Sequence, residues 1–148
     1  MHIEIRKGEP RDFTQVFALI KEFATFITTP EKVLTSPEQM EKDKDFFQYY
    51  VALDGDAVIG FATYFFAYYS WTGKAIYLDD LYVKEPYRGL SIGTKLFDTI
   101  LETGTKENCK KLKWQVSNWN SKAIEFYKNR GADIDDVEIN CDLMLDTL

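Results

Sequence analysis

A run of small residues marks the point where a strand pattern in the sequence changes to a helix pattern. Residues 77–97 read YLDDLYVKEPYRGLSIGTKLF, so an apolar alternating stretch meets Pro86 and then a glycine-rich turn. A helix that begins after such a turn leaves backbone N–H groups without partners at residues 89–94, beside the positive end of its dipole. These groups suit a bound phosphate. The structural alternative is that Gly89 and Gly93 only make a tight turn between strand and helix.

The glycine-rich segment matches neither of two common phosphate-binding motifs. It lacks the lysine of GxxxxGK[ST], and it does not have the GxGxxG spacing of dinucleotide-binding proteins. A nucleotide-binding α/β protein that uses this segment for ATP or a dinucleotide remains an alternative. The absence of the lysine and of magnesium-binding motifs argues against it.

Residue types that are scarce in the sequence also limit its chemistry. His2 is the single histidine, which excludes Ser-His-Asp and Cys-His catalysis and nearly all histidine-based metal sites. We therefore expect no metal cofactor. Cys109 and Cys141 lie far apart without a CxxC motif, so we expect free thiols. Any acid–base catalysis must come from Tyr, Asp, Glu, Lys or the backbone.

Length and composition predict one globular domain, residues 1–148. A hydrophobic share of 45% and an aromatic share of 16% are typical of a packed core. The net charge of −6 argues against general binding of nucleic acids or anionic membranes, and it favours a cationic substrate. The N-terminal residues lack an apolar targeting segment, and no apolar run reaches the roughly 18 residues of a membrane helix. We expect a cytoplasmic protein that does not bind membranes.

Periodicity predicts strands and helices in the order βααβββαβαβ(β). Strands are expected over residues 2–7, 49–53, 57–69, 75–83 and 111–117, with one or two more within 133–145. Helices are expected over residues 11–27, after Ser36, after the glycine-rich segment, and over 121–130 with Gly131 as cap. The class is α/β or α+β, with a mostly antiparallel sheet. Because FATYFFAYY (61–69) is apolar on both faces, helices should cover both sides of the sheet.

The glycine-rich segment and its surroundings resemble a known enzyme family. Arg88-Gly89-Leu90-Ser91-Ile92-Gly93 is similar to the R-x-x-G-x-G/A loop that binds the acyl-CoA pyrophosphate in the GNAT superfamily of N-acetyltransferases. Two longer stretches, IGFATYFFAYYSWTGKAIYLDDLYVKEPYRGLSIG and WNSKAIEFYKNRGA, resemble the diamine branch of that family, the spermidine/spermine and thialysine acetyltransferases. The similarity spans nearly the whole chain and is strongest over residues 59–131. Ser91 departs from the pattern, since the family usually has glycine there.

The resemblance implies a mixed, mostly antiparallel sheet in which two strands splay apart around acetyl-CoA. It implies that the backbone of Leu81, Tyr82 and Val83 holds the acetyl group and the pantetheine arm. The pyrophosphate should be wrapped by Arg88, Gly89, Leu90, Ser91, Ile92, Gly93 and Thr94. Asn120 and Ala123 should line the far side of the cofactor. Ser91 is small enough to be tolerated, and its hydroxyl could donate to a phosphate oxygen.

The resemblance also implies two catalytic residues. An amine that attacks a thioester expels a thiolate, and the phenol of Tyr127 would supply the proton that the thiolate takes up. Asp79 would remove a proton from the amine, through water or directly, with Asp80 beside it. Because neighbouring strand residues point to opposite faces, only one of these two carboxylates should face the site. Structurally, Tyr127 could instead be a packed helix residue, and the two aspartates ordinary strand charges.

The substrate of the resembled family is an amine, and Phe26, Ile27, Asp79, Trp114 and Gln115 stand at positions that should contact it. Phe26 and Ile27 replace an expected aromatic–acidic pair, and Asn118 replaces a second acidic position, so the pocket looks less anionic than a polyamine site. A primary amine is expected, and a thialysine-like amino acid, another small amine or a peptide amine all remain open. Relatives pair as homodimers, which we expect here. A non-catalytic acyl-CoA-binding or regulatory domain of the same fold is the alternative.

Overall fold

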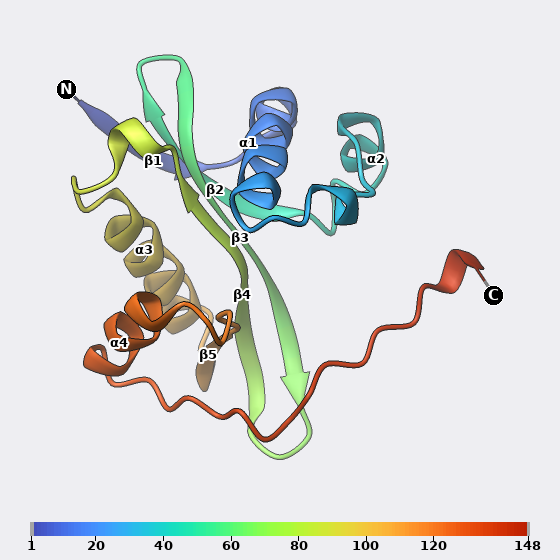
Figure 1. Ribbon diagram of the computed structural model, residues 1–148, viewed down its shortest axis with the longest axis vertical. Coiled ribbons are helices and arrows are strands. Elements are labelled where there is room, and N and C mark those ends of the chain that lie inside the picture. Colours follow the sequence, from blue (N-terminus) through green and yellow to red (C-terminus); the bar gives the residue numbers. More distant parts are fainter. Residues whose placement is uncertain (1, 148) are drawn as a thin grey trace. The chain divides into compact units, whose positions relative to one another are not determined.

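The computed structural model describes residues 2–147, which form two compact units, one ending at Gln115 and the other beginning at Val116. The first unit contains a five-stranded sheet in the order β1-β2-β3-β4-β5 (Figure 1). Its strands are β1 (Ile3–Lys7), β2 (Gln48–Asp54), β3 (Ala57–Tyr69), β4 (Gly73–Val83) and β5 (Lys111–Trp114). Its helices are α1 (Phe13–Phe26), α2 (Pro37–Lys42) and α3 (Ile92–Lys106). All neighbouring strands are antiparallel except β4 and β5, so the predicted mixed sheet is confirmed.

Helices cover both faces of this sheet, as predicted. α1 and α2 pack on one face, where Val16 of α1 and Val51 of β2 share a core with Phe61 of β3. α3 packs on the other face, and its Gly104 approaches β4 so closely that a Cβ atom there would lie 2.7 Å from Ile76. Figure 1 shows α1 and α3 on opposite sides of the strands. The central strands are therefore apolar on both faces because each face has its own helices.

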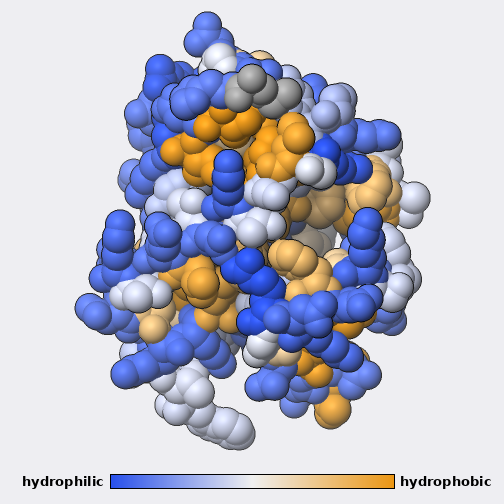
Figure 2. All heavy atoms as spheres, turned by 90° about the vertical axis from the view of Figure 1, so that its left-hand side faces the viewer, coloured by the Kyte–Doolittle hydropathy of each residue, from blue (hydrophilic) through white to orange (hydrophobic). Residues whose placement is uncertain are grey.

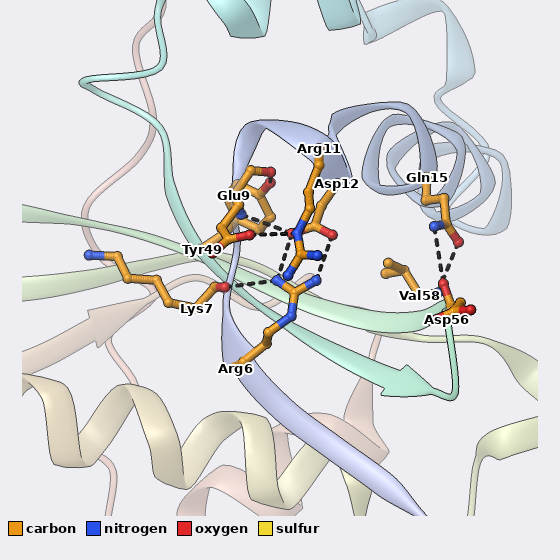
Figure 3. A network of polar contacts seen from close by, with 9 residues as sticks. All are labelled: Arg6, Lys7, Glu9, Arg11, Asp12, Gln15, Tyr49, Asp56 and Val58. Atoms are coloured by element: carbon orange, nitrogen blue, oxygen red, sulfur yellow. Dashed lines mark hydrogen bonds and ion pairs between the residues drawn. The ribbon is translucent and has the colours of Figure 1, made fainter.

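A polar network fixes the junction between β1 and α1 (Figure 3). Arg6 donates two hydrogen bonds, of 2.8 and 2.9 Å, to the buried carboxylate of Asp12. That carboxylate also accepts the backbone N–H of Glu9 at 2.8 Å, and the Tyr49 hydroxyl donates to the Glu9 carbonyl at 2.6 Å. The Arg6 guanidinium holds the pKa of Asp12 below its usual value. The network fixes where α1 begins, which in turn positions the end of that helix near β4.

The second unit contains α4 (Ser121–Asn129) and an extended tail. The Asn120 side chain accepts the Ala123 N–H at 3.2 Å, and Gly131, with φ of 90°, ends the helix as predicted. The prediction of strands within residues 133–145 is wrong, because none of these residues forms a strand. Alternation predicts which side chains share a face, but a strand also needs a neighbouring edge that takes its hydrogen bonds. The prediction that β5 reaches Ser117 is wrong for the same reason, since pairing ends at Trp114.

The face drawn in Figure 2 is mainly hydrophilic, and its apolar side chains gather in separate patches. Charged residues make up 28% of the sequence, which accounts for this surface. Among the helices of residues 2–147, none combines the length and the apolar character needed to cross a membrane.

Candidate active site

Strand β4 has a neighbour on both edges over its first half and on one edge over its second half. From Ala75 to Leu78 it pairs with β3 and β5, and the last pair with β5 joins Leu78 to Trp114. Over residues 80–83 it pairs only with β3 in the five-stranded sheet, and Asp79 is skipped in the register. The backbone at Leu81, Tyr82 and Val83 therefore borders an edge that β5 does not pair with in the first unit, and the splay of two strands around acetyl-CoA remains a prediction.

A β-bulge in β4 places two neighbouring carboxylates on the same face of the sheet. Tyr77 and Tyr82 are five residues apart, yet their partners on β3 are only four apart, because the pairing skips Asp79. Asp79 therefore shares the face of Tyr77, and Asp80 shares the face of Tyr82. This is the face that α1 covers, since Tyr82 belongs to the α1 core. The expectation that the two carboxylates point to opposite faces of the strand is therefore wrong.

A buried threonine stabilises the bulge. The hydroxyl of Thr63 accepts the Asp80 N–H at 2.9 Å, so the bulge leaves this backbone donor satisfied. Partial removal from water raises the pKa of Asp80 to about 6, and the charge of Asp79 adds to the shift. Desolvation also raises the pKa of Asp79, although much of that residue is exposed. Because a carboxyl with a pKa near 6 exchanges its proton close to neutral pH, the pair is suited to acid–base chemistry.

Residues 89–94 form the predicted turn and helix start. Gly89 and Ser91 adopt left-handed conformations, with φ of 81° and 63°, which explains the preference for small residues here. The first hydrogen bond of α3 runs from the Lys95 N–H to the Ser91 carbonyl at 3.0 Å. Within the described residues, no backbone carbonyl accepts the N–H groups of 89–94, and the Ser91 side chain does not cap the helix. A set of unsatisfied donors at the N-terminus of a 15-residue helix suits an anion.

The predicted loop residues differ in exposure. Leu90 is exposed, Gly93 and Thr94 are half-buried, and the Ile92 side chain is almost fully buried. Ile92 can therefore contribute to anion binding through its backbone only.

The end of α1 lies against the beginning of this loop. Arg88 stacks on the ring of Phe26, with its guanidinium carbon 4.9 Å from the ring centroid, and on Tyr82 at 5.3 Å. The Tyr82 hydroxyl donates a hydrogen bond to Glu22 at 2.6 Å. Burial, and to a smaller extent this hydrogen bond, raise the pKa of Tyr82 to about 12. Phe26, which the sequence predicts to contact the amine, therefore lies against Arg88. Arg88 is predicted to contact the cofactor.

The remaining predicted substrate residues do not gather on one face. Ile27 is half-buried at the end of α1. Trp114 packs edge-on against Phe97 of α3 at 5.3 Å, so it lies on the face opposite to Asp79 and Phe26. Gln115 is exposed at the end of the first unit.

Comparison with known proteins supplies the family. The sequence signature of the Acetyltransferase (GNAT) family matches residues 13–132. The chain belongs to this family. Thialysine N-epsilon-acetyltransferase of Sus scrofa is 33% identical over 140 residues, which cover 86% of this chain and 82% of the relative. Spermidine/spermine N(1)-acetyltransferase-like protein 1 of Homo sapiens is 32% identical over 142 residues, 88% of this chain but 20% of that protein.

Solved structures agree on the GNAT fold. One is an aminoglycoside acetyltransferase from an uncultured soil metagenomic sample, in complex with trehalose. Its TM-score is 0.80 at 20% identity, and the match covers 96% of this chain and 97% of that chain. An aminoglycoside N-acetyltransferase in complex with CoA has a TM-score of 0.76 at 15% identity, and the match covers 96% of this chain and 95% of that chain. At these identities the likeness shows the fold alone. The protein is an acetyltransferase, and GNAT acetyltransferases use acetyl-CoA.

The predicted acid of this GNAT protein, Tyr127, lies in α4 of the second unit. Its side chain is half-buried, and burial raises the pKa of the phenol above its usual value, so the phenol carries its proton at neutral pH. Ala123 lies four residues earlier and therefore shares a face of the helix with Tyr127. The catalytic role of Tyr127, and the cofactor contacts of Asn120 and Ala123, remain predictions.

Three residues near this site were not predicted from the sequence. Glu22 lies one turn before Phe26 on α1, and Thr63 is the polar residue in the apolar run FATYFF. Only Thr63 carried a signal, since a polar residue within an apolar, buried strand requires a partner, whereas Glu22 is exposed. Asp80 was named only as a neighbour of Asp79, because the bulge that turns it to the same face has no sequence signature.

Proposed function

We propose that this protein transfers the acetyl group of acetyl-CoA to a primary amine of a small molecule. The observation that carries the proposal is the open edge of β4, which ends at a loop of unsatisfied backbone donors and bears two carboxylates on one face. A flat strand edge can accept an extended pantetheine arm through main-chain hydrogen bonds, and a helix N-terminus can accept its pyrophosphate. The carboxylates can serve a cationic amine.

The residues present fit acetyl-CoA, which when bound supplies the thioester. The N–H groups of residues 89–94 would hold the pyrophosphate, and Arg88 would neutralise part of its charge. The backbone of residues 81–83 would hold the arm. Asp79 would take a proton from the substrate ammonium, directly or through water, so that the nitrogen lone pair forms the new bond to the acetyl carbon. The phenol of Tyr127 would give a proton to the departing thiolate as its bond to that carbon breaks.

The carboxylates near the site support a cationic substrate. Asp79 and Asp80 share one face, and Glu22 adds a third carboxylate beside Tyr82. The relatives named above act on thialysine or bear the name of spermidine/spermine acetyltransferases. We infer that the substrate of this protein presents a primary ammonium group in a small molecule of this kind.

An amine panel with acetyl-CoA tests this assignment. Thiol release would be followed with thialysine, lysine, ornithine, putrescine, spermidine and spermine, and with a lysine peptide. We expect turnover with at least one small amine and little with the peptide. CoA that binds without thiol release from any amine would favour the non-catalytic alternative.

The Tyr127→Phe variant distinguishes catalysis from packing. If the hydroxyl protonates the thiolate, kcat should fall roughly 100-fold or more, with little change in the amine KM. The ring stays, so the melting temperature and CoA affinity should match the wild type. A lower melting temperature with normal kcat would instead assign Tyr127 a packing role.

Three further expectations stay part of this proposal. The protein should be cytoplasmic, it should fold as a single domain over residues 1–148, and it should form a homodimer. Light scattering coupled to gel filtration would measure the mass in solution. A mass of one chain at micromolar concentration would contradict the dimer.

A further inference from the structure

Arg88 is held in place by groups from three parts of the first unit. The centroid of the Phe26 ring, at the end of α1, lies 4.9 Å from its guanidinium carbon, and that of Tyr82, on β4, lies 5.3 Å away. The Arg88 Nε donates to the Val83 carbonyl at 2.9 Å. A side chain that would be flexible in water is therefore restrained directly before the loop at residues 89–94.

The Tyr82 ring is itself restrained by α1. Its hydroxyl donates to Glu22 at 2.6 Å, and its ring stacks on Phe23 with centroids 5.2 Å apart. Tyr82 is also buried, so its ring is a fixed platform. Phe26, by contrast, is 56% exposed, and the stability of the core does not account for a large aromatic residue at this position.

We propose that Phe26 and Tyr82 form an aromatic clamp that positions Arg88 for the pyrophosphate of acetyl-CoA. This makes Phe26 a positioning residue for the cofactor, in place of the amine contact that the sequence predicts, and it rests on the proposed function. A cation held over aromatic faces keeps its charge available to a phosphate. Because the guanidinium is placed before the ligand arrives, less conformational freedom is lost on binding.

Calorimetric titration with CoA tests the clamp without relying on catalysis. Phe26→Leu removes the ring but keeps apolar volume, and it should weaken CoA binding about two- to fivefold. Phe26→Trp keeps an aromatic face and should bind CoA within about twofold of the wild type. In an Arg88→Ala background, Phe26→Leu should cause no further loss, because the clamp then has no guanidinium to hold.

Phe65→Leu is the matched control. Phe65 is a partly exposed phenylalanine of β3 that stacks on Tyr77 at 4.8 Å, and the change should leave CoA affinity unaltered. Equal losses from Phe26→Leu in both backgrounds, with CoA still bound by the wild type, would overturn the clamp alone. Wild-type protein that binds no CoA would overturn the proposed function together with the clamp.

Discussion

The two halves of β4 belong to one strand but differ in what lies on their edges. In the first half, Ile76 pairs with Phe66 of β3 and Leu112 of β5, and its side chain is buried against α3. In the second half, Asp79 has no strand-pairing partner among residues 2–147, since β5 has ended and the bulge skips it in the pairing with β3. The first half holds the sheet together. We propose that the backbone and the carboxylates of the second half bind ligands, so we expect stability and activity to divide between the two halves.

The largest effect is expected from Ile76→Ala in the doubly paired half. Loss of a fully buried side chain packed between the sheet and α3 should lower the free energy of unfolding by about 3 kcal/mol. Urea denaturation would measure the loss. The kcat of the molecules that remain folded should be close to that of the wild type. A large fall in their kcat would contradict the division of stability and activity between the two halves of β4.

Asp79→Asn in the open half should affect activity rather than stability. Removing the base should lower turnover roughly 100-fold near neutral pH. Because the amine, with a reference pKa of about 10.4 if lysine-like, deprotonates without help at higher pH, part of the activity should return as pH rises. Rates measured from pH 6 to 10 test this. A variant with the pH profile of the wild type would leave Asp79 without a role in proton transfer.

Asp80→Asn should stabilise the protein in a pH-dependent way. The pKa of Asp80 is raised in the folded state to about 6, so the folded state binds this proton more tightly than the unfolded chain. Stability should therefore fall as pH rises from about 4 to 6, and the variant should avoid this loss. We expect it to exceed the wild type by about 1 to 2 kcal/mol at pH 7.5 and to match it near pH 4. Equal stability at both pH values would contradict the shift.

The smallest effect is expected from Ser91→Gly, beyond the end of the open half. Glycine relieves the left-handed strain of Ser91 but makes the unfolded chain more flexible, so stability should change by less than about 0.5 kcal/mol. CoA affinity should stay within a few fold. Ser91→Leu is the contrasting variant, because a bulky side chain should keep the pyrophosphate from the backbone donors. If Ser91→Leu binds CoA normally, the phosphates lie elsewhere.

Much of this organisation follows from the sequence. Periodicity predicts the helices and strands of the first unit, and the Ser36 cap of α2 is confirmed by its hydrogen bond to the Gln39 N–H at 3.1 Å. The glycine-rich segment predicts the open start of α3, since left-handed backbone favours small residues. The single histidine limits the catalytic groups that the protein can use.

The strands predicted within residues 133–145 show what periodicity alone cannot predict. Val137, Ile139 and Leu143 alternate with polar residues as in a strand, yet they are 78%, 84% and 70% exposed, and no strand forms there. Alternation is a local property that specifies faces. Strand pairing is a tertiary property, because the hydrogen bonds come from another segment.

Pairing between distant segments also sets the geometry of the candidate site, which local sequence patterns do not contain. The sequence shows the carboxylates of Asp79 and Asp80 and predicts an anion site at residues 89–94, and the family resemblance predicts that Arg88 supplies its cation. The face that both carboxylates share depends on a bulge, and the bulge depends on pairing with Thr63 across the sheet. The clamp on Arg88 depends on where α1 ends in space. Contacts between residues distant in the chain set these positions, so no local pattern could have predicted them.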